Sequence, residues 1–137
     1  MPIDAVVADA NVLLAAVVGK AALRVFTEFE VTVHVAEFNA AEVKEYLPHM
    51  AAKYALAPEL VEVQWSLLPI HVHPSNEYGG RLDRALAALA ARDPEDAHAL
   101  ALAWELGLPI WSNDRDLNAL GAECFSTARL LAALERE

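Results

Sequence analysis

Ile3-Asp4-Ala5-Val6-Val7-Ala8-Asp9 places a short apolar run directly before a single carboxylate. An apolar run of this length is typical of a strand that is buried on both faces, as in a parallel sheet. The residues that follow, 11–18, have a helical pattern, and Gly19 is expected to end it. The stretch therefore predicts a buried parallel strand with Asp9 at its carboxyl end, followed by a helix.

Strand and helix patterns alternate along the rest of the chain. We expect further strands at 31–35, 69–73, 109–111 and 123–125, and further helices at 20–29, 37–54, 58–68, 81–91 and 93–106. Gly107 should stop the helix before it, Pro48 should kink or break the 37–54 helix, and 74–80 should be the main turn-rich segment. Residues 113–120 should form a turn and a short helix, and Ser126 or Thr127 should cap a final helix. This alternation predicts an α/β fold with a parallel sheet covered on both faces.

The composition limits the class of protein. A length of 137 residues fits one domain, 1–137, and 56% hydrophobic content is enough for a sizeable core. No stretch approaches the roughly 20 apolar residues of a spanning helix, and the N-terminus lacks the features of a signal peptide, so we expect no membrane association. A single cysteine, Cys124, excludes an internal disulfide and a cysteine-rich zinc site, and a reducing cytoplasm is the simplest location.

The net charge of −10 counts against a stable complex with nucleic acid, because proteins that bind nucleic acids usually carry a basic surface. Acids that bind metal ions are locally neutralised, however, and local potential matters more than net charge. A weak, transient substrate complex also needs fewer phosphate contacts than a repressor does. The charge therefore argues against a stable complex more than against catalysis on a nucleic acid.

Isolated acidic residues stand at the polar ends of apolar segments. Asp9 ends the first strand, Glu42 lies in the 37–54 helix, and the other acids open a helix or follow a strand: Asp93, Asp96, Asp114 and Asp116. An open α/β sheet brings its strand ends to one edge, where such sheets bind ligands. Because clustered carboxylates repel one another, a cluster usually means a bound cation. Mg²⁺ or Mn²⁺ prefers oxygen ligands, and two such ions roughly 3.5–4 Å apart can hold a phosphodiester and activate a water.

Each acid also has an ordinary structural role, and the sequence leaves that alternative open. Asp9 and Asp93 can cap helices, Asp96 can interact with a helix dipole, and the remaining acids can be solvated helix surface or turn residues: Glu42, Glu45, Asp114 and Asp116. The ordered set of acids favours a metal site over a series of unrelated caps and turns.

Histidine, tryptophan and cysteine give weaker signals. His71 and His73 would share one face of a strand, but a zinc pair lacks an evident third ligand, so surface or packed histidines are favoured. His98 lies inside an apolar helix and is expected to be hydrogen-bonded core or a pocket wall. Cys124 is expected to be a small buried residue. The three tryptophans, Trp65, Trp104 and Trp111, are expected to be core or interface residues, and Trp111 could also flank the acids.

Four short motifs together resemble a PIN domain. They are Val6-Val7-Ala8-Asp9-Ala10-Asn11-Val12-Leu13, Ala41-Glu42-Val43, Asp93-Pro94-Glu95-Asp96-Ala97 and Ile110-Trp111-Ser112-Asn113-Asp114-Arg115-Asp116-Leu117. Each motif is weak alone, but the set occurs in family order and spans nearly the whole chain. The resemblance implies a three-layer α/β/α sandwich with a parallel, roughly five-stranded central sheet. It also implies a magnesium- or manganese-dependent nuclease, usually acting on RNA, in a family that includes VapC-type toxin ribonucleases.

The resemblance assigns roles to residues by position. Asp9, Glu42, Asp96 and Asp114 resemble the four catalytic, metal-binding acids, with Glu45 as the alternative to Glu42. Asp93 resembles a further ligand seen in part of the family, and Asp116 would contribute through water. Asn11 and Asn113 would support the site by orienting a ligand or the attacking water. The basic residues near the motifs, and so the candidates for substrate binding, are Lys20, Arg24, Lys44 and Arg115. The implied cofactor is one or two Mg²⁺ or Mn²⁺ ions.

The function implied by the resemblance is hydrolysis of RNA by an endoribonuclease, in which water attacks phosphorus in line. A role as the toxin of a toxin–antitoxin pair, with an antitoxin protein as partner, fits the family. The alternative is a catalytically silent binding protein on the same fold. The apolar helical stretches 85–91 and 130–134 suit a homodimer or a higher homo-oligomer. Phosphoryl transfer through an aspartyl-phosphate on Asp9 is less favoured, because Asp9-Ala10-Asn11 lacks the second aspartate that such chemistry needs.

Overall fold

A five-stranded parallel sheet forms the centre of the molecule. The computed structural model describes residues 3–89, 96–114, 117 and 120–137. The strands are β1 (Ala5–Ala8), β2 (Thr32–Ala36), β3 (Ile70–His73), β4 (Ile110–Trp111) and β5 (Cys124–Phe125). They lie in the order β3-β2-β1-β4-β5, and every neighbouring pair is parallel. The predicted parallel sheet of about five strands is therefore confirmed.

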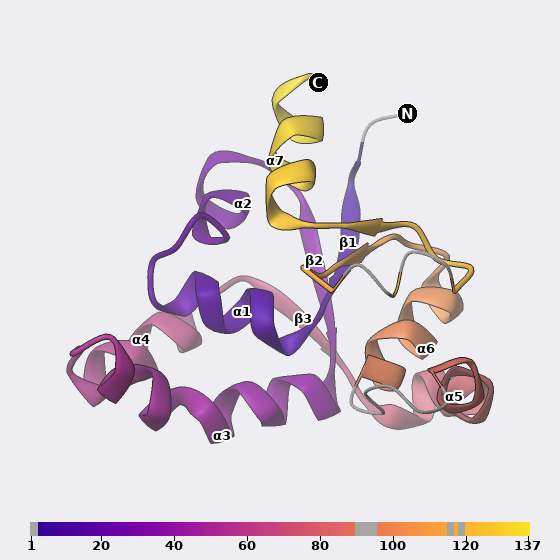
Figure 1. Ribbon diagram of the computed structural model, residues 1–137, viewed down its shortest axis with the longest axis horizontal. Coiled ribbons are helices and arrows are strands. Elements are labelled where there is room, and N and C mark those ends of the chain that lie inside the picture. The colour runs from indigo at the N-terminus through magenta and orange to yellow at the C-terminus, as the bar shows by residue number, and fades with distance from the viewer. Residues whose placement is uncertain (1–2, 90–95, 115–116, 118–119) are drawn as a thin grey trace.

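Helices cover both faces of this sheet. They are α1 (Ala10–Val17), α2 (Leu23–Glu28), α3 (Glu37–Lys53), α4 (Pro58–Leu67), α5 (Ser75–Leu89), α6 (Ala97–Leu106) and α7 (Thr127–Glu135). Buried side chains of α1, α2, α3, α4 and α7 form one core cluster, and those of α5 and α6 form a second. Figure 1 shows the two groups of helices on opposite sides of the strands, which confirms the three-layer α/β/α sandwich.

The central strand β1 explains why the apolar run decides the fold. Val6 and Ala8 pack into the first core cluster, while Val7, which points to the opposite face, packs into the second. All three are completely buried. Because side chains alternate across a strand, only a run without polar residues can sit between two helical layers. β1 therefore holds the centre of the sheet, and Asp9 follows at its carboxyl end.

Helix ends occur where the sequence predicted them in most cases. Gly107 follows α6 with a φ of +66°, a left-handed conformation that glycine adopts at little cost. The Ser126 side chain accepts a hydrogen bond from the Arg129 backbone N–H at 3.2 Å. Ser126, not Thr127, is therefore the cap of α7. Within the described residues, no helix is both long enough and apolar enough to cross a membrane.

The sequence predicted a kink or a break at Pro48, and the break was wrong. Helix α3 is continuous from Glu37 to Lys53 with Pro48 inside it. A proline inside a helix costs about 3 kcal/mol, because a backbone hydrogen bond is lost and the ring crowds the preceding turn. Leu47 and Ala51, on either side of the proline, are both buried in the core, so tertiary packing keeps the segment helical across the proline.

The turn-rich segment predicted at 74–80 was also wrong, because α5 begins at Ser75 and includes Gly79 and Gly80. Glycine weakens a helix by about 1 kcal/mol relative to alanine. Tyr78, in the first turns of α5, is completely buried and shares a 2.9 Å hydrogen bond with His98 Nδ1 of α6. This tertiary anchor explains why the segment is helical despite its two glycines.

Candidate metal centre

Asp9 joins the sheet to the first helix. Its backbone N–H donates to the Trp111 carbonyl at 3.2 Å, which ties it to β4. Its Oδ1 accepts a hydrogen bond from the Val12 N–H at 3.0 Å, so Asp9 is the N-cap of α1. The residue is only 5% exposed. The capping role that the sequence left open is therefore real, and it coexists with a buried carboxylate at the ligand-binding edge of the sheet.

The environment of Asp9 raises the pKa of its carboxyl group. Burial is the main cause, and the charge of Asp114 adds to it. Hydrogen bonds from Ser112, Val12 and Asn11 act in the opposite direction by stabilising the carboxylate. Burial and the neighbouring negative charge of Asp114 both destabilise the carboxylate form of Asp9. A cation between Asp9 and Asp114 would offset both effects.

A cavity of about 260 Å³ brings the predicted residues together. Its lining consists of Asp9, Asn11, Asp96, Asn113 and Asp114. These residues come from the carboxyl end of β1, the first turn of α1, the start of α6 and the segment after β4. Residues that are about a hundred positions apart in sequence therefore meet at one edge of the sheet. Three of the four predicted acids and both predicted asparagines line this cavity.

Asp96 and Asp114 reach the cavity from different elements. Asp96 is half-buried and directly precedes α6, whose N-terminal backbone carries a partial positive charge. The Asp114 backbone N–H donates to the Ser112 side-chain oxygen at 3.0 Å. Ser112 is buried and also contributes a hydrogen bond to Asp9. Ser112 thus connects two of the acids, a role that its position between Trp111 and Asn113 in the fourth motif could have indicated.

Glu42 does not line this cavity. It is half-buried on α3, which packs against α1, and its Oε1 accepts a 2.8 Å hydrogen bond from Asn39 Nδ2. Glu45 is exposed on the same helix. Asn39 is buried, and within the described part of the chain its Oδ1 has no hydrogen-bond partner. The structure thus favours Glu42 over Glu45 as the acid held toward the protein interior.

The chemistry of the lining fits a hard divalent cation, since carboxylate and amide oxygens are the ligands that Mg²⁺ and Mn²⁺ prefer. Among the residues that the structure describes, no three His, Cys, Asp or Glu side chains are grouped closely enough to hold a metal ion. The three acids share a cavity without converging on one point. Asp93, Arg115 and Asp116 lie outside the described residues, so their predicted roles stay predictions.

The basic residues proposed from sequence lie elsewhere. Arg24 forms ion pairs with Glu28 at 2.7 Å and Glu135 at 2.9 Å, and the Lys20 ammonium lies 4.8 Å from the centre of the Tyr54 ring. Lys44 is exposed on α3. These three cations are absent from the lining of the acid cavity among the described residues.

Arg129 is the basic residue beside the acids that sequence reasoning missed. It lines a second cavity together with Asn113 and Asp114, and these two residues also line the acid cavity. Its Nη1 donates to the Cys124 carbonyl at 3.0 Å. A signal existed in the sequence, because Arg129 belongs to the first turn of the helix that follows the last strand. Residues in that position lie at the ligand-binding edge of a parallel sheet.

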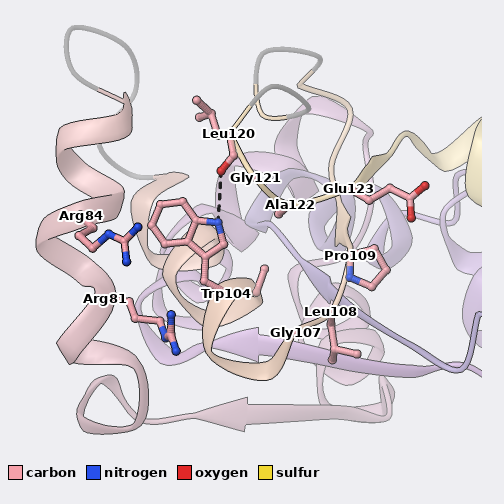
Figure 2. A pocket seen from close by; sticks show the side chains of 11 residues that line it. Arg81, Arg84, Trp104, Gly107, Leu108, Pro109, Leu120, Gly121, Ala122 and Glu123 are labelled. Carbon is pink, nitrogen blue, oxygen red and sulfur yellow. Dashed lines mark hydrogen bonds between the residues drawn. The ribbon is translucent and has the colours of Figure 1, made fainter.

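A further cavity, of about 570 Å³, lies at the amino-terminal ends of β4 and β5, away from the acid cavity (Figure 2). Residues just before β4 and β5 line it, together with Arg81, Arg84 and Trp104. Arg81 pairs with Glu105 at 3.3 Å, and the Arg84 guanidinium lies 5.7 Å from the Trp104 ring centre. The Trp104 indole N–H donates to the Leu120 carbonyl at 3.2 Å. These arginines are therefore engaged away from the acids.

The histidines form hydrogen-bonded groups. His34 Nδ1 lies 2.8 Å from His73 Nε2, and His73 Nδ1 lies 2.6 Å from Glu77 Oε2. Burial, with the nearby His73 and His71, lowers the pKa of His34. His98 bonds to Tyr78 and stacks on Phe38 with ring centres 4.1 Å apart. The expectation of packed or hydrogen-bonded histidines thus agrees with the described contacts.

Comparisons with known proteins agree with this architecture. The family model described as PIN domain matches residues 7–135. The crystal structure of PAE2754 from Pyrobaculum aerophilum is similar with a TM-score of 0.67 and 19% identity, over 100% of this chain and 98% of that one. A toxin–antitoxin complex from Klebsiella pneumoniae gives a TM-score of 0.65 and 16% identity, over 89% and 97% of the two chains. VapBC2 from Rickettsia felis, bound to a DNA fragment from its promoter, gives 0.66 and 10%, over 89% and 98%.

No curated protein sequence matches the chain. The family model nevertheless extends from β1 to α7, which includes every element of the sheet and all the residues that line the acid cavity. The resemblance inferred from four short motifs is thereby confirmed, and the chain belongs to the PIN domain family.

Proposed function

We propose that this chain is a metal-dependent endoribonuclease that hydrolyses phosphodiester bonds. The observation that carries the proposal is the cavity in which Asp9, Asp96 and Asp114 lie together at the carboxyl edge of the sheet. Membership of the PIN domain family, whose members are generally nucleases, supports the same activity. A histidine or cysteine nucleophile plays no part in the proposal, since carboxylates and a bound cation suffice for this reaction.

Asp9, Asp96 and Asp114 would hold one or two Mg²⁺ or Mn²⁺ ions, and Glu42 would join them from α3. A divalent cation in such a site lowers the pKa of water and neutralises charge on the phosphodiester. Hydrogen bonds within the protein hold the segments that carry two of these proposed ligands. Asp9 is held by the cap of α1 and by Ser112, which also accepts a hydrogen bond from the Asp114 backbone. Rigid placement of this kind is what a metal site needs from its surroundings.

The asparagines contribute neutral polar groups to the same cavity. Asn113 Oδ1 accepts a hydrogen bond from the Thr127 N–H at 2.9 Å, which joins the segment after β4 to the start of α7. Asn11 is exposed at the rim. In hydrolysis the water oxygen bonds to phosphorus while the bond to the leaving oxygen breaks in line. We infer that the two amides orient the substrate or the water for this displacement.

We also propose that the chain acts as a toxin with an antitoxin partner. Two similar solved structures are a toxin–antitoxin complex and VapBC2 on promoter DNA, and they support this setting. An antitoxin would neutralise the activity by occupying the acid cavity or its surroundings, and the toxin would form a homodimer or a higher homo-oligomer. Co-expression with the product of a neighbouring small gene, followed by co-purification and loss of cleavage, tests the pairing.

The test of the nuclease activity is cleavage of a 5′-labelled single-stranded RNA with Mn²⁺ or Mg²⁺. We expect cleavage that a chelator abolishes. Loss of a group that only orients a metal ligand costs roughly 10–100-fold, so removal of a ligand in Asp96→Asn should cost about 100-fold or more. Asp83→Asn is the matched control, because Asp83 is exposed on α5 and absent from the acid cavity lining. Equal cleavage by wild type and Asp96→Asn would reject the proposal.

The same protein preparation distinguishes the nuclease from the alternative, a catalytically silent binding protein. Titration calorimetry with Mn²⁺ near neutral pH should show binding to the wild type and weaker binding to Asp96→Asn. Absence of both Mn²⁺ binding and cleavage in the wild type would favour a catalytically silent binding protein on this fold.

A further inference from the structure

A second cavity opens next to the acid cavity and shares a wall with it. It has a volume of about 610 Å³ and is lined by Ser112, Asn113, Asp114, Cys124, Ser126, Ala128 and Arg129. Asn113 and Asp114 line both cavities. A ligand bound in the second cavity would therefore lie directly beside a group held by the acids.

The sizes of the two cavities suit different parts of one substrate. Sites for small ligands are roughly 300–1,000 Å³. The acid cavity, at about 260 Å³, is below that range, whereas the second cavity, at about 610 Å³, is within it. The acid cavity has room for a phosphodiester group and its ions, and the second cavity has room for a sugar and a base.

Arg129 supplies positive charge to the second cavity. Its Nη1 donates to the Cys124 carbonyl at 3.0 Å, and its guanidinium carbon lies 5.3 Å from the centre of the Phe125 ring. A carbonyl and an aromatic ring fix the position of a guanidinium, but neither cancels its net charge. Arginine in such a fixed orientation is suited to contact phosphate oxygens, because its planar fork of N–H groups matches them.

The position of Arg129 is coupled to that of the acids. Asn113 Oδ1 accepts the Thr127 N–H at 2.9 Å, and Ser126 caps the same helix through the Arg129 N–H at 3.2 Å. These bonds link the first turn of α7 to the segment that carries Asp114. The backbone segments that carry Arg129 and Asp114 are therefore held next to each other, as two parts of a single site require.

We propose that the second cavity binds the nucleotide adjacent to the scissile phosphodiester, with Arg129 contacting the phosphate of that nucleotide. The proposal rests on the proposed nuclease function and adds the position and the form of its substrate. A nucleotide in a duplex is paired and stacked, and must be extruded before it can enter a cavity of this kind. That nucleotide is therefore unpaired when the cavity holds it.

Steady-state cleavage with Mn²⁺ tests the contact. Arg129→Ala should raise KM for a labelled single-stranded RNA about tenfold, as expected for loss of a charged hydrogen bond, and change kcat less than twofold. Arg136→Ala is the matched control, since it removes the same charge from the exposed far end of α7 and should leave KM unchanged. Equal KM values for Arg129→Ala and wild type, with cleavage intact, would overturn the proposal while the nuclease function stands.

Fluorescence anisotropy with the same RNA in a chelator gives a readout that does not need cleavage. Loss of one phosphate contact should reduce the slope of log K against log salt by about 0.7 in Arg129→Ala, and not in Arg136→Ala. The RNA annealed to its complement should bind at least about tenfold more weakly than the single strand, and equal affinity would contradict the proposal. If the wild type does not cleave, an Arg129-dependent slope still supports the nucleotide site, whereas an identical slope rejects it.

A second uncharged substitution at Arg129 keeps the test valid if the first variant does not fold. If Arg129→Ala lacks a cooperative melting transition, Arg129→Gln keeps most of the side chain and should show the same rise in KM. A folded Arg129→Gln protein with the KM of the wild type would reject the contact.

Discussion

Substitution of Asp9 separates its structural role from its proposed metal-binding role. Asp9→Asn keeps a side-chain oxygen that can accept the Val12 N–H, and asparagine is as good an N-cap as aspartate. The same change removes a buried negative charge that lies near Asp114. Asp9→Ala removes both the cap and the charge. The two variants therefore differ mainly in whether α1 keeps its N-terminal hydrogen bond.

The expected shifts in melting temperature follow from the size of the chain. For 137 residues the entropy of unfolding is about 290 cal/mol/K, so 1 kcal/mol corresponds to about 3.5 °C. Loss of the cap in Asp9→Ala costs about 1 kcal/mol, or about 3–4 °C. In a chelator, Asp9→Asn should melt at or above the wild type, because no charge is buried. Mn²⁺ at ten times its dissociation constant should stabilise the wild type by about 1.4 kcal/mol, or about 5 °C.

The assay is thermal unfolding by circular dichroism of the three proteins, each with chelator and with Mn²⁺. We expect the Mn²⁺ shift in the wild type alone. An equal Mn²⁺ shift in Asp9→Asn would show that the ion binds elsewhere. Melting of Asp9→Asn as low as Asp9→Ala, in the chelator, would show that the carboxylate charge, not the cap, stabilises the folded state. Either result would refute the reasoning about this residue.

Four further predictions follow from the described contacts. Burial raises the pKa of Asp9 in the folded protein above the value of 3.8 expected in the unfolded chain, so the folded state binds more protons between these two pKa values. Without metal, the stability of the wild type relative to Asp9→Asn should therefore fall as pH rises from the unfolded to the folded pKa, which melting scans across pH can check. Burial raises the pKa of Cys124 to about 11, so iodoacetamide at pH 8 should modify the native thiol far more slowly than the unfolded one, by mass spectrometry. Tyr78→Phe should lower the melting temperature by about 3–4 °C, from about 1 kcal/mol for the lost bond to His98. Glu42→Gln should reduce RNA cleavage more than Glu45→Gln, with both rates measured under the same Mn²⁺ concentration.

The sequence predicted the elements whose signals are local. The apolar run before Asp9 is typical of a strand covered on both faces, which β1 is, and Gly107 ends α6 because its backbone adopts positive φ. The failures at Pro48 and at 74–80 have a common cause. Leu47 and Ala51 keep α3 helical across Pro48, and Tyr78 anchors α5, through contacts with residues distant in the sequence. Local propensity carries no information about such contacts.

In the candidate site, too, local sequence signals identified some residues, and contacts made only in the folded chain account for the others. Asp9, Asp96 and Asp114 were identified because each follows a strand or opens a helix, and the parallel topology then places them at one edge. Ser112 and Arg129 were missed because their contributions depend on side-chain directions that only the folded chain defines. Their positions, after the fourth strand and in the first helical turn after the last strand, indicate the ligand-binding edge of the sheet, but position alone does not tell which contacts a side chain makes.

The acidity of the chain is compatible with a polyanionic substrate only if local charge differs from net charge. Arg24 and Arg81 pair with carboxylates in the structure, so these guanidinium charges are already offset by neighbours. Arg129 instead contacts a neutral carbonyl beside the acid cavity. In the proposed complex, bound cations and Arg129 would attract a phosphate locally, whereas the net charge of −10 disfavours a stable complex with a long nucleic acid. Binding would then depend on a few phosphate contacts, which suits a nuclease that releases its product more than a protein that stays on RNA.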